Sequence, residues 1–259
     1  MGVLKAILLA VISGKAKVLT MIFLDAAFVV MLVLFGRLVG MLAPSLNSSI
    51  FSTIGSSQLW YVLLLLAVYS LFLLFLYSLV KFLVLHYVQS LFEQAQMDFG
   101  RFLSFYGLNL CLFAIFGALY ALIAYFIAAV RQPYAAVVLL SLSIPYFILL
   151  FITLSSAHAL FHGKDKGAWK SLSQGFSFTF TKARIYGKII GVSALVVLVF
   201  LLLLFLIGLG IRSMAFAHYG FYASAYGIFA GAISILSPVV AYVILLFNRI
   251  GFYYIIRKG

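Results

Sequence analysis

Long apolar runs separated by short polar stretches dominate this chain. Six of the runs exceed the roughly 20 residues that an apolar α-helix needs to cross the hydrocarbon core of a bilayer. The strict alternation of short segments that is typical of a transmembrane β-barrel is absent from the sequence. The pattern predicts an all-α fold: a polytopic membrane helical bundle of six transmembrane helices, arranged as three hairpins in a single integral membrane domain over 1–259. The predicted spans are about Ala16–Leu42, Leu59–Val88, Phe102–Val130, Tyr134–Phe161, Ile189–Ile211 and Tyr226–Ile256.

Three of the more polar stretches also carry apolar residues at helical spacing. In the second, apolar residues recur at Val88, Leu91, Phe92, Ala95 and Phe99, which is the three-to-four-residue spacing of one helix face. A helix of this kind is suited to lying in the membrane interface. We therefore expect interfacial amphipathic helices at 1–14, 88–100 and 163–182. In the last of these, Trp169, Leu172 and Phe176 are predicted to share the apolar face.

Composition excludes a soluble domain. Hydrophobic residues make up 67% of the chain and charged residues 8%, whereas soluble domains are nearer half apolar and a quarter charged. The net charge of +13 does not indicate nucleic-acid binding, because the cations are scattered between apolar runs and form no single polar domain. They fit orientation signals and contacts with anionic lipid.

The basic residues predict the orientation of the spans. Cytoplasmic loops carry an excess of Lys and Arg, and the longest interruption between apolar runs, 161–188, holds six of the 17 basic residues against one acid, Asp165. The N-terminus has Lys5, Lys15 and Lys17, whereas the loop at 44–58 has no charge. We therefore expect a multi-pass cell-membrane protein with both termini cytoplasmic.

Aromatic residues are interleaved with the cations of the 161–188 stretch. Orientation alone requires only the charges, so this mixture indicates contact with lipid headgroups, each cation contributing about 1 kcal/mol. Membrane lipids, anionic ones in particular, are the expected partners, beside a possible membrane protein partner or a homo-oligomer. The candidate headgroup contacts are Lys164, Lys166, Trp169, Lys170, Lys182, Arg184 and Lys188.

Small residues and prolines suggest how the spans pack and bend. Small side chains let a neighbouring backbone approach, and a proline inside a helix removes one backbone hydrogen bond. Pro145 and Pro238 are therefore predicted kinks, which either line a cavity or are tolerated bends. The predicted packing residues are Gly107, Cys111, Ala114 and Ala118 in the third span and Gly227 and Gly231 in the sixth.

A few charges fall inside the predicted spans. Asp25 lies eight residues into the first span, about 12 Å deep at 1.5 Å per residue, and Arg249 lies at a comparable depth in the sixth. Intramembrane charges are costly and face a partner or a cavity. They indicate either a structural pair, Asp25–Arg249 or Asp25–Lys81, or the pathway of a small solute or ion transporter. The lack of a second carboxylate argues against a cation-coupled transporter.

Candidate chemistry is sparse. His158 and His162 are four residues apart and Asp165 follows, a spacing that suits a metal, with His86 expected at the same membrane rim. The alternative is that these histidines are hydrogen-bonded rim residues. We find no metalloprotease, nucleophile-elbow, P-loop or dinucleotide motif, so the sequence predicts no catalytic residue and no cofactor. A metal-dependent membrane enzyme using these four residues stays an alternative.

The stretch Ala168-Trp-Lys-Ser-Leu-Ser-Gln-Gly-Phe, followed by Lys182-Ala-Arg184 and Gly187, is similar to a motif of a broad prokaryotic group. These are six-helix membrane proteins akin to the membrane domain attached to some glycerophosphodiester phosphodiesterases. The resemblance covers the second half of the chain, implies a six-helix module and carries over no catalytic residue. The leading hypothesis is a non-enzymatic membrane module that interacts with lipid, or that serves as an accessory or scaffold subunit.

Overall fold

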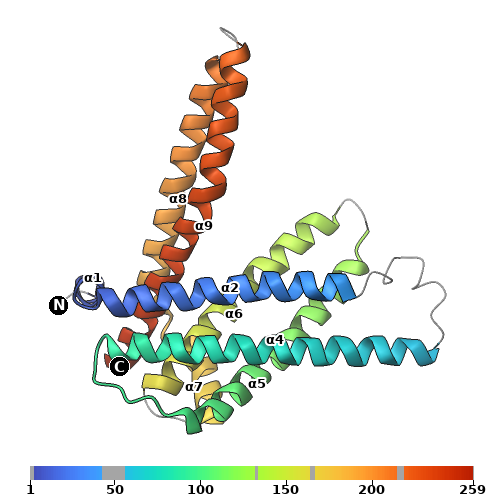
Figure 1. Ribbon diagram of the computed structural model, residues 1–259, viewed down its shortest axis with the longest axis vertical. Coiled ribbons are helices and arrows are strands. Elements are labelled where there is room, and N and C mark those ends of the chain that lie inside the picture. The colour runs from blue at the N-terminus through green and yellow to red at the C-terminus, as the bar shows by residue number, and fades with distance from the viewer. Residues whose placement is uncertain (1–2, 43–55, 132–133, 164–166, 215–218, 259) are drawn as a thin grey trace. The chain divides into compact units, whose positions relative to one another are not determined.

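The computed structural model describes residues 3–42, 56–131, 134–163, 167–214 and 219–258. Every regular element in these residues is a helix (Figure 1). The elements are α1 (Val3–Ser13), α2 (Lys15–Leu42), α4 (Ser56–Ser90), the 3₁₀ turn η1 (Phe99–Arg101), α5 (Phe102–Ala128), α6 (Ala135–Gly163), α7 (Ala168–Thr181), α8 (Ala183–Met214) and α9 (Tyr219–Lys258).

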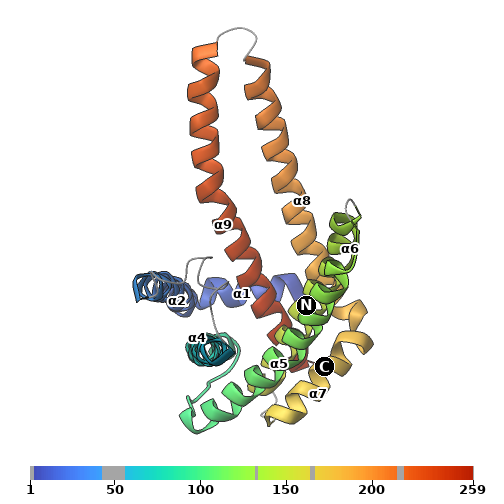
Figure 2. The same ribbon diagram turned by 90° about the vertical axis from the view of Figure 1, so that its right-hand side faces the viewer.

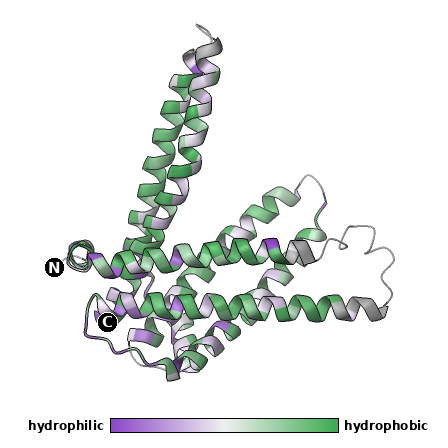
Figure 3. Ribbon diagram, viewed as in Figure 1, coloured by the Kyte–Doolittle hydropathy of each residue, from purple (hydrophilic) through white to green (hydrophobic). Residues whose placement is uncertain are grey.

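Six of these helices are long and apolar enough to cross a membrane. Their candidate spans run for 24 to 37 residues, and Figure 3 shows the hydrophobic colour continuing along them. Only 0% to 17% of each apolar window is buried inside the protein. So much outward-facing hydrocarbon is stable only where lipid replaces water. The all-α class and the six spans are therefore confirmed, and the chain is a multi-pass integral membrane protein.

The chain divides into two compact units, 8–179 and 1–7 with 180–259. In the 8–179 unit, α2 packs along α4 (Figure 1), and α4, α5 and α6 contact one another. Their shared core is aromatic-rich, and Leu172 and Phe176 of α7 pack against it. The buried members of this core are Phe82, Leu85, Phe105, Leu108, Leu112, Phe116, Tyr146, Ala157, Phe161 and Leu172.

The other unit is built on α8 and α9, which run side by side (Figures 1 and 2). The first turns of α8 contact the last turns of α9. There, Ser193 Oγ donates to Asn248 Oδ1 at 2.8 Å, and the Tyr186 and Phe252 rings stack. Gly251 permits the close approach, because a Cβ there would lie 2.6 Å from Ile189 Cδ1. Packing and the buried Ser193–Asn248 hydrogen bond therefore both join the two helices.

The predicted helix over 88–100 is wrong beyond Ser90. There α4 ends in a turn, residues 94–98 are not helical, and η1 follows. Asp98 explains the start of η1, because its carboxylate accepts from Gly100 N–H at 2.9 Å. A side chain that satisfies a nearby backbone donor competes with a continuous helix.

In the described residues, none of the predicted packing residues belongs to a buried helix face, and their role in helix packing stays a prediction. Cys111, Ala114 and Ala118 are exposed, and a Cβ added to Gly107 would meet nothing within 4 Å. The packed face of α5 carries Phe105, Leu108, Asn109, Leu112 and Phe116 instead. In the sixth span, Gly227 and Gly231 are exposed as well, and an added Cβ would meet nothing within 4 Å at either position.

The two prolines do not end their helices. Pro145 lies inside the continuous helix α6 and Pro238 inside α9.

Candidate functional site

The basic stretch folds as α7 and the first turns of α8. One face of α7 is buried and carries mainly small or polar residues, namely Ser171, Leu172, Gly175 and Thr179. Close approach is possible because Gly175 has no Cβ: an added one would lie 2.9 Å from Ala157 Cβ of α6. Thr179 Oγ1 donates to Gly175 O at 2.9 Å and lies 3.1 Å from Thr153 Oγ1, so the Thr153 hydroxyl is the donor between α6 and α7.

Cations and large aromatic rings are exposed along this stretch, in α7 and in the residues that follow it. Trp169 is 76% exposed and Phe180 71% exposed, so Trp169 does not share the packed face of Leu172. The range 167–188 contains no carboxylate. Lys170, Lys182, Arg184 and Lys188 are exposed as well, whereas Lys164, Asp165 and Lys166 lie outside the described residues.

The predicted intramembrane charges are divided between the two units. Asp25 of α2 and Lys81 of α4 belong to the 8–179 unit, whereas Arg249 of α9 belongs to the other. Each is partly buried, and each takes part in an interaction. The alternative pairs Asp25–Arg249 and Asp25–Lys81, and the transport pathway, stay predictions.

A buried polar network that the sequence did not predict joins α4, α5 and α6. Asn109 Nδ2 donates to Ser78 Oγ at 3.0 Å, and Asn109 Oδ1 lies 2.7 Å from His158 Nε2. Since an amide oxygen only accepts, His158 Nε2 carries the proton. Asn109 is 2% exposed. The sequence feature that could have indicated this network is the lone amide inside an apolar span, because burying an amide without hydrogen-bond partners is costly.

His158 and His162 each lie beside the ring of Phe105. The Phe105 ring lies 5.0 Å from the His158 ring and 5.4 Å from the His162 ring, measured between centroids. Within the described part of the chain, no three His, Cys, Asp or Glu side chains are arranged to hold a metal ion. The proposed metal set of His86, His158, His162 and Asp165 includes one residue outside that part.

A small polar void lies beside His162, near the start of α5. Its volume is about 20 Å³, which is room for one water molecule. Within the described residues, the buried His162 Nε2 has no hydrogen-bond partner, so a water in this void is the partner we expect. Arg101 closes this end, because it donates to Phe161 O at 2.8 Å and lies over the Phe161 ring. The lining residues are Phe82, His86, Gln89, Gln96, Met97, Asp98, Arg101 and His162.

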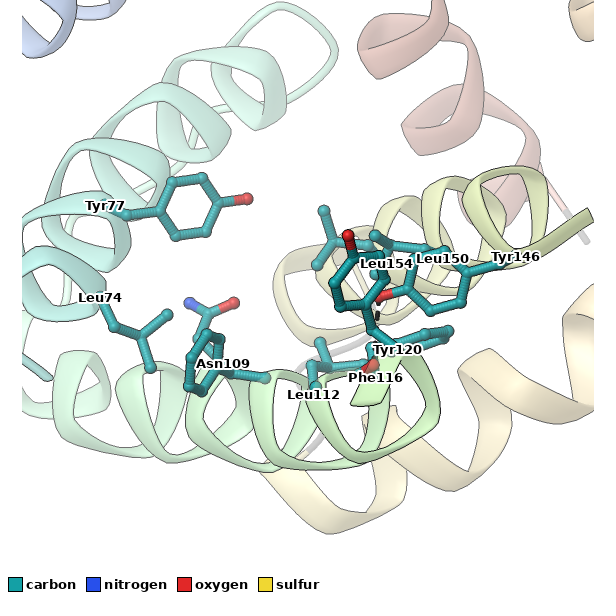
Figure 4. Close-up of a pocket in the computed structure, with 11 residues that line it drawn as sticks. Leu74, Tyr77, Asn109, Leu112, Phe116, Tyr120, Tyr146, Leu150 and Leu154 are labelled. Atoms are coloured by element: carbon teal, nitrogen blue, oxygen red, sulfur yellow. Dashed lines mark hydrogen bonds between the residues drawn. The ribbon is translucent and has the colours of Figure 1, made fainter. Parts of the chain in front are cut away.

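A larger cavity of about 370 Å³ lies between α4, α5 and α6 (Figure 4). This is within the range of about 300–1,000 Å³ that is usual for small-molecule sites. None of the described residues that line it carries a charge. They are Leu74, Tyr77, Asn109, Leu112, Phe113, Phe116, Gly117, Tyr120, Tyr146, Leu150 and Leu154.

Tyrosine rings shape one end of this cavity. Tyr146 donates its hydroxyl to Phe116 O at 3.1 Å, and its ring lies 5.7 Å from the Tyr120 ring. Asn109 and Tyr77 point into the space from α5 and α4 (Figure 4). The cavity therefore combines hydrocarbon and aromatic walls with an amide near one end.

Comparisons with protein-family models, curated proteins and solved structures found no match to this chain. The resemblance to the six-helix prokaryotic group therefore stays a prediction.

Proposed function

We propose that this chain is a non-enzymatic membrane module that interacts with anionic lipid through the 167–188 segment. The observation that carries the proposal is the exposure of the described cations and of the Trp169 and Phe180 rings along a segment without a carboxylate. Arg and Lys attract anionic headgroups, and Trp and Phe insert their rings at the boundary between headgroups and hydrocarbon. The Trp169 and Phe180 rings stay exposed while Phe176 packs against the core, and exposed large rings suit an interface and not water.

The proposed topology places this segment on the cytoplasmic side. Six crossings bring both termini to the same side, and the excess of Lys and Arg at the N-terminus and at 161–188 favours the cytoplasm. The contacts of α2 with α4, α5 with α6 and α8 with α9 support three out-and-back hairpins. In this arrangement α1 and α7 lie in the interface, and α7 and the start of α8 face the anionic leaflet.

The expected loss of affinity for anionic lipid follows from the number of cations that are neutralised. Lys170, Lys182 and Arg184 together contribute at most about 3 kcal/mol to headgroup binding, at about 1 kcal/mol each. Since 1.4 kcal/mol is a factor of ten, neutralising all three lowers the affinity for anionic lipid by up to about a hundredfold.

The test compares two charge-matched variants in nanodiscs that contain phosphatidylserine and phosphatidylcholine. Lys170→Gln/Lys182→Gln/Arg184→Gln removes three cations of the proposed contact, and Arg37→Gln/Arg131→Gln/Arg212→Gln removes three expected on the opposite side. Phosphatidylserine that copurifies with the protein into detergent is counted by native mass spectrometry. We expect loss of phosphatidylserine in the first variant and retention in the second. Equal retention in both would refute headgroup recognition by this segment.

A further inference from the structure

We propose that the cavity between α4, α5 and α6 is a binding site for an uncharged lipid. The ligand class is a long apolar chain ending in one hydroxyl or carbonyl group, and the group that recognises it is the amide of Asn109. This site is separate from the headgroup contacts of 167–188 and does not depend on them.

The position of the cavity indicates where its ligand comes from. All eleven lining residues lie in the candidate spans of α4, α5 and α6. Phe113 is 54% exposed and Tyr120 51% exposed, and Gly117 between them is exposed as well. These residues form the mouth of the cavity on an apolar part of α5. A mouth at this depth meets lipid chains, so the occupant enters from the bilayer.

The lining excludes a charged occupant. It consists of Leu, Phe, Tyr, Gly and one Asn, and an ion without a partner is strongly disfavoured in such surroundings. Arg101, in the separate polar void, lies eight residues before Asn109 on the same helix axis, or about 12 Å at 1.5 Å per residue. The guanidinium of Arg101 is bonded to Phe161 O, so it does not supply a counter-charge to the cavity.

Asn109 supplies the polar contact. Its amide gives one N–H to Ser78 and one lone pair to His158, and an amide carries a second N–H. Asn109 points into the cavity (Figure 4), so we assign this N–H to the oxygen of the ligand. His158 and Ser78 hold the amide in place from two other helices.

The apolar chain then runs from Asn109 toward the mouth. Asn109 and Tyr120 are eleven residues apart on α5, which is about 16 Å along the helix axis. Phe116, Tyr146 and Leu150 line the path between them. A chain longer than this continues through the mouth into the surrounding lipid.

Three probes with the same chain and different ends test the ligand class. Hexadecanol, hexadecane and palmitate are added at equal mole fraction to nanodiscs holding the full chain, at about pH 9, well above the ordinary carboxyl pKa. Bound probe is counted by native mass spectrometry. We expect hexadecanol to exceed hexadecane about threefold to tenfold, the worth of one hydrogen bond in a membrane, and to exceed palmitate about a hundredfold. Palmitate binding equal to that of hexadecanol would overturn the uncharged class.

A matched pair of variants tests the site itself. Gly117→Leu adds a large side chain at the mouth of the cavity, and a Cβ at this position meets nothing within 4 Å, so the helix tolerates it. Gly107→Leu is the same change on the same helix, equally open but outside the cavity lining. We expect hexadecanol binding to be lost in the first and kept in the second. Unchanged binding in Gly117→Leu, or no hexadecanol binding by the unmodified chain, would overturn the proposal.

The same experiment separates this site from the headgroup contacts. Lys170→Gln/Lys182→Gln/Arg184→Gln leaves the cavity lining intact, so hexadecanol binding should be unchanged in it. Loss of hexadecanol binding in that variant would show that the two lipid contacts are one site and would overturn the independence stated above.

Discussion

Gly175 lies against Ala157 of α6, so Gly175→Ala tests the packing of the basic helix. An added Cβ would lie 2.9 Å from Ala157 Cβ and 3.1 Å from both Ala157 Cα and Ala157 N. Two of these three atoms belong to the backbone of a long helix and do not move aside as a flexible side chain does. The helices must separate, and overpacking of this kind costs about 1–3 kcal/mol.

The higher helix propensity of alanine opposes that cost. Replacing glycine in a helix interior contributes up to about 1 kcal/mol in favour of folding. With the full gain in helix propensity, we therefore expect Gly175→Ala to lower the free energy of unfolding by up to about 2 kcal/mol. Gly187→Ala is the matched control, because Gly187 lies inside α8, is exposed and has open space around its Cα. It should be neutral or stabilising by up to about 1 kcal/mol.

The assay is reversible unfolding in mixed lipid–detergent micelles, followed by circular dichroism as SDS is added. Ala157→Gly removes the nearest of the three opposing atoms, so the double variant Gly175→Ala/Ala157→Gly should be more stable than the sum of the single changes predicts. A Gly175→Ala protein as stable as the Gly187→Ala control would refute the close approach of α7 to α6. Strict additivity in the double variant would refute a contribution of the Ala157 Cβ to the clash.

Further measurements address the polar network, the membrane spans and the headgroup contacts. Asn109→Leu removes two interhelical hydrogen bonds and should lower the free energy of unfolding by about 1–3 kcal/mol. Asn248→Leu removes the one hydrogen bond with Ser193 and should lower it by about half as much. Equal losses in the SDS assay would contradict this ordering. Cys111 is exposed on α5 within a candidate span, so a membrane-impermeant maleimide should label it in SDS and not in intact membranes, and labelling in both would contradict the span. Raising the salt concentration to 1 M shortens the Debye length to about 3 Å, so phosphatidylserine retention should fall while hexadecanol binding is unchanged; a parallel loss of both would argue against separate sites.

The helix boundaries that sequence predicted best are those set by local chemistry. The six spans follow from hydropathy, because any apolar segment of sufficient length must satisfy its own backbone hydrogen bonds in lipid. The start of α5 at Phe102 agrees with the predicted start. The error at 88–100 has a local cause as well: apolar spacing there resembled a helix, but Asp98 caps η1 through Gly100 and the helical hydrogen bonds stop after Ser90.

The packed faces were harder to predict. In water, the polar side of a helix reveals which side is buried, but a membrane helix is apolar toward lipid and toward its neighbours alike. The small residues Cys111, Ala114 and Ala118 therefore looked like a packing face, whereas the structure buries Phe105, Leu108, Asn109, Leu112 and Phe116. Asn109 carried the useful signal, since an amide in hydrocarbon needs partners, but its sequence position did not identify them.

By itself, the sequence determined the class of the protein, the number of spans and the distribution of charge between them. These properties depend on transfer of each segment from water to lipid, which is a sum over local residues. Only the tertiary structure decided that Asn109 lies between Ser78 and His158, that Gly175 lies against Ala157, and that three helices enclose an uncharged cavity. Those contacts join residues 18 to 49 positions apart in the chain, and they depend on shape and hydrogen-bond geometry, which hydropathy does not encode.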